Sequence, residues 1–375
     1  MKILYMAPMR LPTEKAHGIQ IMETCAALVR AGAEVELLIS NRRTHIKEDA
    51  FEYYSIKDRF PITRLSAPET ISYGRVGFLL HAIIFAFRAV QYARKVKPDF
   101  VYTRDPATLS ICSLMGIGPL AWEVHTTHPR VPRTILRGVK AFIAITRGLA
   151  EWYVSLRAIP KADMHVAPDA VNLSAFESIR DLSAARENLR ARLGLSKEAN
   201  IALYAGSFGL YEWKGVDVAR EAARHAPEVA WLFVGGSLDE CDALKRGAAA
   251  NVYTLPRVHR KDIPNLISAA DVLLLPNKRG DAASDRDTSP MKLFEYMASG
   301  VPIVASDVPS LREVLNDRNA FLAVPNDPIL LAEKVRHVLA NSGEASTRAA
   351  SARADVKNYT WDKRAEGILQ FLSKR

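Results

Sequence analysis

The chain has 375 residues, of which 49% are hydrophobic and 25% charged, so it has room for two α/β domains and is not a disordered or low-complexity polypeptide. Its three cysteines, Cys25, Cys112 and Cys241, lack CxxC or Cys/His spacing, which excludes a disulfide framework or a zinc knuckle and favours a reducing cytoplasm. The net charge of +10 is uneven, because residues 1–168 contain 23 Lys and Arg against 14 Asp and Glu. This excess predicts an anionic partner near the first half, with a simple basic surface as the alternative.

Short apolar strands alternate with helices in the first half. We predict strands at 2–8, 33–39, 100–103, 120–125 and 141–146, and a helix at 18–31. Strands separated by helices indicate a parallel sheet with helices on both faces. The N-terminal residues run directly into the first strand and do not resemble a signal peptide.

The segment 74–88 is unusually apolar. Its uninterrupted apolar run is too short to span a membrane and is broken by His81 and Arg88. A buried helix packed on the sheet is the prediction, and a face that contacts a membrane is the alternative.

Basic residues recur at three- and four-residue spacing at Arg130, Arg133, Arg137 and Lys140. A helix there would carry a basic stripe, either a solvated face or an acceptor-side surface for a phospholipid, polyprenyl phosphate or anionic saccharide. No nucleic-acid-binding signature with interleaved aromatics is present, so nucleic acid is not expected as a partner.

The strand and helix pattern restarts after an irregular junction near residues 160–176. We predict strands at 200–205, 230–234, 252–255, 272–275 and 301–305, and helices at 216–225, 263–269 and 361–374. The expected fold is therefore α/β, with two Rossmann-like doubly wound domains whose loops face a central cleft. The domains are 1–168, 169–356 and a C-terminal helix, 357–375, returning to the first. The first loop lacks GxGxxG, which disfavours an oxidoreductase.

The segment from Asp287 to Gly300 has the design of a nucleotide site. Ser289-Pro290 is suited to a helix start, and free amides there would bind a phosphate. Glu295 lies one turn further, where it would accept hydrogen bonds from ribose hydroxyls, unless it is an ordinary helix-surface glutamate.

Several motifs in order resemble the retaining glycosyltransferases of family 4, also called group 1 glycosyl transferases. They are Gly18 after the first strand, Glu123-Val-His125, Ala144-Ile-Thr-Arg-Gly-Leu149, Pro168-Asp-Ala-Val-Asn172, Trp213-Lys-Gly-Val-Asp217, Ser268-Ala-Ala-Asp271 and the segment Asp287 to Gly300. The resemblance covers essentially the whole chain. It implies the GT-B fold and same-face transfer of a sugar from a nucleotide-diphosphate donor.

The resemblance assigns roles to particular residues. It implies His125, Lys214 and Asp287 as catalytic, with Lys214 neutralising the leaving phosphate and His125 meeting the donor sugar. Glu123 would hold the imidazole or meet an acceptor. The donor-binding set is Gly18, Ser207, Lys214, Arg257, Val258, Asp287, Thr288, Ser289, Met291, Lys292 and Glu295, with Arg257 and Val258 at the nucleobase.

This chain departs from the family pattern at three points. Asp287 replaces the first glutamate of an acidic pair, Gly206-Ser207 lacks the usual arginine, and His17-Gly18 stands for a glycine pair. Lys292 would then share the phosphate with Lys214.

The expected activity is retaining transfer of a hexosyl-type sugar from a UDP, GDP or ADP sugar to a hydroxyl acceptor, without cofactor or metal. The expected location is cytoplasmic, with peripheral contact at the inner face of an anionic membrane. The alternatives are a GT-B-like nucleotide-sugar epimerase or sugar phosphorylase, and a non-catalytic subunit of a polysaccharide assembly complex.

Overall fold

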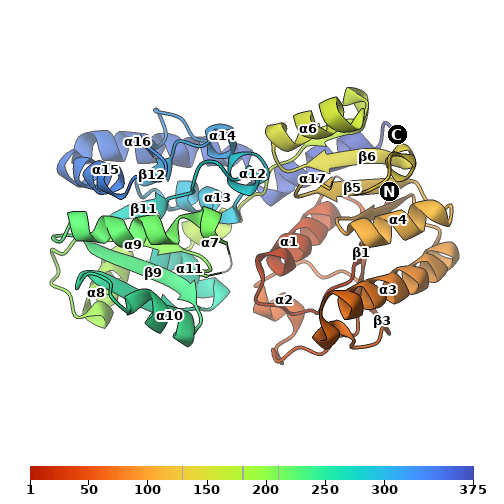
Figure 1. The fold of residues 1–375 in the computed structure, drawn as a ribbon, viewed down its shortest axis with the longest axis horizontal. Coiled ribbons are helices and arrows are strands. Elements are labelled where there is room, and N and C mark those ends of the chain that lie inside the picture. Colours follow the sequence, from red (N-terminus) through yellow and green to blue (C-terminus); the bar gives the residue numbers. More distant parts are fainter. Residues whose placement is uncertain (129, 180, 210) are drawn as a thin grey trace. The chain divides into compact units, whose positions relative to one another are not determined.

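The computed structural model describes every residue except Pro129, Arg180 and Leu210. It divides into two compact units, Met1–Pro168 with Trp361–Arg375, and Asp169–Thr360 (Figure 1). The second boundary lies four residues beyond the one expected after residue 356. Val356 belongs to the core of the second unit, and Thr360 bridges to Val171, so these residues stay with that unit.

The first unit contains a parallel sheet of seven strands in the order β3-β2-β1-β4-β5-β6-β7. In chain order they are β1 (Lys2–Ala7), β2 (Glu34–Ser40), β3 (Ile62–Leu65), β4 (Phe100–Thr103), β5 (Leu120–Val124), β6 (Val139–Ala144) and β7 (Met164–Val166). Its helices are α1 (Ala16–Arg30), α2 (Ala50–Tyr53), α3 (Gly74–Val96), α4 (Pro106–Leu114), α5 (Arg133–Arg137), α6 (Arg147–Arg157) and α17 (Trp361–Leu372). The order of the strands reverses between β1 and β4, the type of position at which open α/β sheets bind ligands.

The second unit contains a parallel sheet of six strands in the order β10-β9-β8-β11-β12-β13. They are β8 (Ile201–Ala205), β9 (Ala230–Gly236), β10 (Val252–Pro256), β11 (Val272–Leu275), β12 (Ile303–Ser306) and β13 (Phe321–Ala323). The helices α7 (Ser174–Glu177), α8 (Leu182–Leu193), α9 (Val216–His225), α10 (Leu238–Lys245) and α11 (Ile263–Ser268) come before or between the first four strands. They are followed by α12 (Ala282–Asp285), α13 (Met291–Ser299), α14 (Pro309–Arg312), α15 (Pro328–Ala340) and α16 (Ser342–Asp355). Here the order reverses between β8 and β11.

Each sheet is buried on both faces, which explains why its strands are runs of apolar residues rather than alternating patterns. All four residues of β11, Val-Leu-Leu-Leu, are buried, as are all five of β8. Trp122 on β5 and Trp231 on β9 are among the largest fully buried side chains. The loops at the carboxyl ends of these rigid strands carry the candidate site residues.

Helix α3 differs from the expectation of a buried helix. Phe85 and Ala89 are buried in the core of the first unit, but Val76 and Leu79 are 79% and 53% exposed. Within the described part of the chain, Ile71–Val96 is the one helical stretch long and apolar enough to cross a membrane. Of its most apolar 18-residue window, 44% is buried inside the protein, and core helices of soluble proteins can be equally long and apolar.

Candidate functional site

The loop after β8 carries two polar groups of the candidate site. Lys214 Nζ donates a hydrogen bond of 2.6 Å to Ser207 Oγ, and it lies 4.8 Å from the centre of the Tyr211 ring. Burial lowers the pKa of Lys214 below its ordinary value. The lysine is thus held in a low-polarity setting, where its charge acts more strongly on an anion than in water.

Gly215, the residue after Lys214, explains why the loop follows this path. Its φ is +66°, and a Cβ there would lie 1.8 Å from the carbonyl oxygen of Pro276. Only glycine fits a positive φ with the backbone after β11 so close. The Lys-Gly pair therefore fixes the loop of Lys214 against the neighbouring strand.

A second lysine reaches the same loop from the first turn of α13. Lys292 Nζ is buried without a hydrogen-bond partner among the described residues, and lies 3.8 Å from the centre of the Tyr204 ring. A Cβ on Gly206 would be 3.5 Å from this Nζ. Burial first, and then the charge of Lys214, lower the pKa of Lys292 well below its ordinary value. Two ammonium groups therefore meet at the Gly206-Ser207 loop.

The start of α13 adds backbone donors to these cations. Pro290 occupies the position before the helix, and Met291 is its first residue. The first amides of a helix have no partner within the helix and carry the positive end of its dipole. Ser289 Oγ accepts a hydrogen bond of 3.0 Å from the amide of Asp169, which anchors the turn. Thr288, next to it, is buried.

Glu295 is buried on α13 and is not a surface glutamate. It forms an ion pair with Arg260, which lies on a short 3-10 helix, Arg260–Asp262, after β10. Arg260 was not predicted from the sequence, because nothing local relates it to Glu295, 35 positions away. Asp287 is also buried, and its carboxylate accepts a hydrogen bond of 2.7 Å from the neighbouring Arg286.

Arg257 and Val258, both expected at a nucleobase, have different environments in the structure. Arg257 is exposed and donates to the carbonyl of Gly235 at 3.2 Å. Val258 is partly buried and lines a cavity of about 540 Å³ together with Asp262 and Leu266. Of these two residues, Val258 therefore lines an open pocket and Arg257 does not.

The first unit has a different polar centre, the fully buried carboxylate of Glu123 on β5. Gln20 and Tyr102 donate hydrogen bonds to it, at 2.5 Å each. His125 Nε2 lies 2.5 Å from Glu123 Oε1, and Arg364 Nη2 lies 3.0 Å from the same oxygen. Glu123 was expected to hold the imidazole or to meet an acceptor. The first role has this geometry, whereas for the second the carboxylate is fully buried and already bonded to Gln20, Tyr102 and His125.

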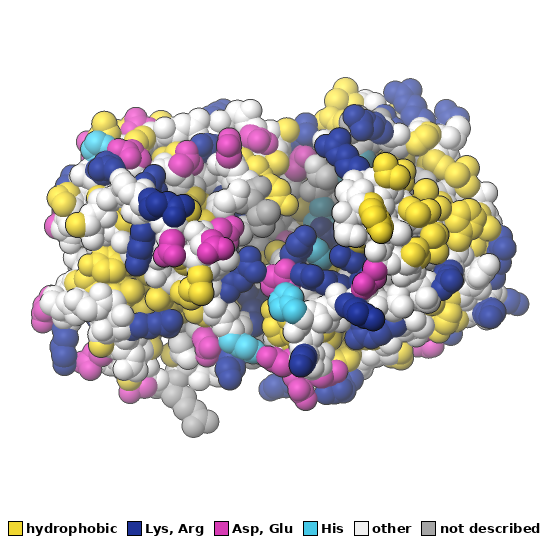
Figure 2. Space-filling model, turned by 60° about the horizontal axis from the view of Figure 1, so that its bottom comes forward, with side chains coloured by type: hydrophobic (Ala, Val, Ile, Leu, Met, Phe, Trp, Pro, Cys, Tyr) yellow, Lys and Arg dark blue, Asp and Glu magenta, His cyan; other side chains and the backbone are white. Residues whose placement is uncertain are grey.

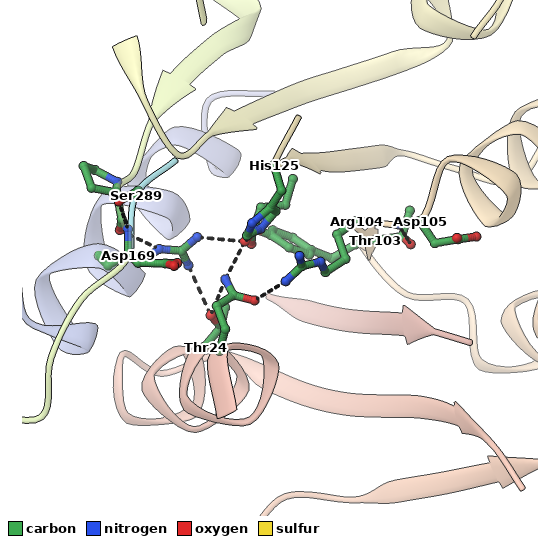
Figure 3. A network of polar contacts seen from close by, with 12 residues as sticks. Thr24, Thr103, Arg104, Asp105, His125, Asp169 and Ser289 are labelled. Atoms are coloured by element: carbon green, nitrogen blue, oxygen red, sulfur yellow. Dashed lines mark hydrogen bonds and ion pairs between the residues drawn. The ribbon is translucent and has the colours of Figure 1, made fainter. Parts of the chain in front are cut away.

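The surrounding residues come from separate elements of the first unit (Figure 3). Arg364 lies on α17 and donates to Thr24 of α1 at 3.2 Å, while Arg104, after β4, donates to Gln20 at 3.0 Å. Arg364 was not predicted from the sequence, because it reaches β5 only through the return of α17 to the first unit.

The charges of this centre set the protonation of its members. Burial alone would raise the pKa of Glu123, but Arg364 and then His125 outweigh it and hold that pKa well below its usual range. Burial, helped by the charge of Arg104, lowers the pKa of His125 to about 4. His125 is therefore neutral near pH 7 and bound to a carboxylate.

Two further predictions change in the structure. The amide of Gly18 donates to Lys15, and a Cβ at Gly18 would meet the Tyr54 hydroxyl at 2.2 Å, so packing against Tyr54 already explains this glycine. The expected basic helix is wrong, since α5 ends before Gly138 and β6 begins one residue later. Only Arg133 and Arg137 lie on it, whereas Arg130 precedes it and Lys140 lies on β6, although all four are exposed.

Among the residues that the structure describes, no group of three or more His, Cys, Asp or Glu side chains is arranged to hold a metal ion. The positive groups of the candidate site in the second unit are Lys214, Lys292 and the first amides of α13.

Comparison with known proteins adds independent evidence. Residues 185–373 match the family model described as glycosyl transferases group 1, and residues 18–175 match that of glycosyltransferase family 4. A D-inositol 3-phosphate glycosyltransferase of Xylanimonas cellulosilytica is 33% identical over 62% of this chain, and the match spans 57% of that relative's length. A phosphatidyl-myo-inositol mannosyltransferase of Mycobacterium tuberculosis is 26% identical over 72% of each chain. The crystal structure of HepE of Anabaena in complex with UDP-glucose superposes with a TM-score of 0.75 over 100% of each chain, at 19% identity.

Proposed function

Since this chain belongs to the group 1 glycosyltransferases and has the GT-B fold, we propose that it transfers a sugar from a nucleotide-diphosphate sugar to a hydroxyl acceptor with retention of anomeric configuration. The observation that carries this proposal is the pair of lysines at the Gly206-Ser207 loop. Burial of Lys292 Nζ without a hydrogen-bond partner among the described residues disfavours its charged form, so its position at this loop supports a site in which an anion stabilises the ammonium.

The donor diphosphate would lie between Lys214, Lys292 and the first amides of α13. When the bond from the anomeric carbon to the phosphate oxygen breaks, negative charge grows on that oxygen, and both ammonium groups stabilise it. The acceptor oxygen forms the new bond on the same face of the sugar, and its proton passes to the leaving phosphate. The relative solved with UDP-glucose supports a nucleotide-sugar donor of this kind.

The ribose hydroxyls would bind Glu295, as expected from the sequence. Its ion pair with Arg260 holds the carboxylate in a fixed position, and carboxylate oxygens accept hydrogen bonds from hydroxyl groups. Asp287 remains a candidate for the donor sugar and His125 for catalysis. Cytoplasmic location is also part of the proposal.

The decisive experiment compares Lys214→Ala with Lys278→Ala. Lys278 pairs at the surface with Asp217 and serves as a matched lysine outside the proposed site. We measure binding of UDP, GDP and ADP sugars by calorimetry, and turnover with a panel of acceptors. Lys214→Ala should reduce turnover by a factor of about 100 or more, the effect of removing one group that stabilises developing charge, while Lys278→Ala should not.

Unchanged turnover in Lys214→Ala would contradict the proposal. Release of a new sugar isomer without acceptor would identify an epimerase. Donor binding without turnover across the panel would identify a non-catalytic subunit. The anomeric configuration of the product tests retention: an α-linked donor should give an α-linked product, and a β-linked product would contradict retention.

A further inference from the structure

We propose that the exposed apolar face of α3 docks the first unit on the surface of an anionic lipid bilayer. This surface lies outside the lysine site and the Glu123 centre. It belongs to residues 74–88, which were expected to form a buried helix. The docking face comprises the exposed side chains Val76, Leu79, Leu80 and Phe87 of α3, with Tyr73 just before the helix.

The spacing of these residues makes one continuous stripe along the helix. Val76, Leu79, Leu80 and Phe87 recur at intervals of three, four and seven residues, which places them on one face. Tyr73 and Val76 are 78% and 79% exposed at its beginning, and Leu114 at the end of the neighbouring α4 is 77% exposed. Soluble proteins rarely leave so many large apolar side chains together in water.

The helix is anchored on its other face, so the stripe is presented by a fixed element. His81 Nδ1 lies 2.8 Å from the carbonyl of Pro68, and Thr70 Oγ1 donates to the carbonyl of Gly77 at 2.7 Å. Phe85 and Ala89 are fully buried in the core of the first unit. Spanning a membrane would require removing this buried face from the core, whereas lying on the bilayer uses only the exposed face.

Charge selects an anionic bilayer as the occupant. Residues 71–98 contain five Lys and Arg and no Asp or Glu. Arg75 and Arg88 are exposed, as are Arg94 and Lys95 near the end of the helix. Arg88 and Arg94 donate hydrogen bonds to the backbone carbonyls of Ser66 and Met115, and neither forms an ion pair with a described residue. Figure 2 shows hydrophobic side chains gathered on the surface of this unit with Lys and Arg side chains at their margin.

The same charges disfavour a second copy of this chain as the occupant. A symmetric pair would place the cations of one α3 beside those of the other, with no acidic residue on either helix. An interfacial helix with an apolar face and flanking cations instead matches acyl chains and anionic headgroups together.

The test is co-sedimentation of the full chain with extruded vesicles, without donor or acceptor, so that its outcome is independent of the proposed function. One set of vesicles is phosphatidylcholine alone, and the other contains phosphatidylglycerol as well. The protein should bind the anionic vesicles and not the neutral ones. Val76→Gln/Leu79→Gln should weaken this binding by about tenfold or more.

Charge variants and a matched control complete the design. Arg75→Gln/Lys95→Gln should weaken binding by roughly fivefold for each removed cation. Leu238→Gln/Val324→Gln removes two exposed apolar side chains from the second unit and should have no effect. Thermal unfolding of each variant verifies that its fold is retained.

Three results would overturn the proposal. They are absent or equal binding to the two vesicle types, equal loss of binding in the Leu238/Val324 control, and a dimer in light scattering that dissociates in Val76→Gln/Leu79→Gln. The last result would assign the face to a second copy of the chain.

Discussion

Lys292 is the residue whose environment is hardest to explain by stability alone. Its ammonium is buried, lacks a described hydrogen-bond partner and has the charge of Lys214 nearby. An anion would turn this unfavourable arrangement into a favourable one. The folded state binds fewer protons at Lys292 than the unfolded state between its lowered pKa and the ordinary value of about 10.4, so this lysine makes stability rise with pH in that window.

Lys292→Met should therefore separate stability from binding. We expect the ligand-free protein to keep its stability or to gain about 1 kcal/mol, since an unpaired buried charge is removed. Affinity for UDP should fall by roughly tenfold to a hundredfold, the value of a charged hydrogen bond. Urea unfolding and calorimetry measure the two effects, with Lys278→Met as the control. Retained affinity together with lost stability would assign Lys292 a packing role only.

His125 gives a second prediction at this scale. Its folded pKa of about 4 lies below the ordinary value of 6.5, so the folded state binds fewer protons between these values and stability is lost as pH falls through this range. His125→Asn should remove part of that loss, roughly 2 kcal/mol between pH 7.5 and pH 4.5. Urea unfolding at both pH values measures it. An unchanged pH dependence would show that the imidazole is not held neutral.

At the scale of elements, apolar runs bounded by glycine and proline predicted the inner strands of both sheets, whereas the short edge strands β3, β7 and β13 were not predicted. The strands Phe100–Thr103 and Val272–Leu275 and the helix Val216–His225 occur with the expected bounds, because both faces of each sheet are covered and burial dominates local choice. The predicted basic helix was wrong because its basic residues are exposed, so burial gives no signal there. The spacing of the cations does not show that the helix ends at Gly138 and that β6 begins at Val139.

The candidate site was predicted in part. The residues that were predicted lie in local motifs, whereas those that were missed have partners far away in the sequence. Lys214 and Lys292 stand out locally, beside a glycine and at a helix start. Arg260 and Arg364 could not be found in this way, because their partners Glu295 and Glu123 are reached only through sheet topology and the return of α17. The partial exposure of α3 is likewise decided by which neighbours cover it.

Gly215→Ala tests the loop that holds Lys214. The added methyl would meet the carbonyl oxygen of Pro276 at 1.8 Å, at a φ of +66°. We expect a loss of more than about 2 kcal/mol in the free energy of unfolding. Gly194→Ala is the matched control, since its φ is +68° but nothing lies within 4 Å, and it should cost only about 1 kcal/mol. Equal losses in the two variants would contradict the close contact with Pro276.

At the scale of the whole molecule, the chain leaves the first unit at Pro168 and returns to it at Trp361. The returning helix α17 packs against α1 and supplies Arg364 to the buried carboxylate of Glu123. The first unit is therefore built from two distant stretches of sequence. Its polar centre is complete only when both are present.

Arg364→Met should leave Glu123 buried without its main compensating charge. The expected loss is about 3–5 kcal/mol in the free energy of unfolding. Without Arg364 the pKa of Glu123 rises, so the deficit should shrink as pH falls toward 4.5 and the carboxyl becomes protonated. Arg30→Met is the control, because Arg30 joins α1 to Asp362 of α17 at the surface and should cost at most about 1 kcal/mol. A deficit independent of pH would mean that lost packing, and not charge, causes it.

The return of α17 also has a consequence for synthesis on the ribosome. When the first 168 residues have emerged, the nascent chain holds every strand of its first sheet but not the arginine that neutralises its innermost acid. Until nearly two hundred further residues have been translated, Glu123 lacks Arg364 and is either protonated or exposed to water. Helix α17 thus completes a unit whose other elements are translated much earlier.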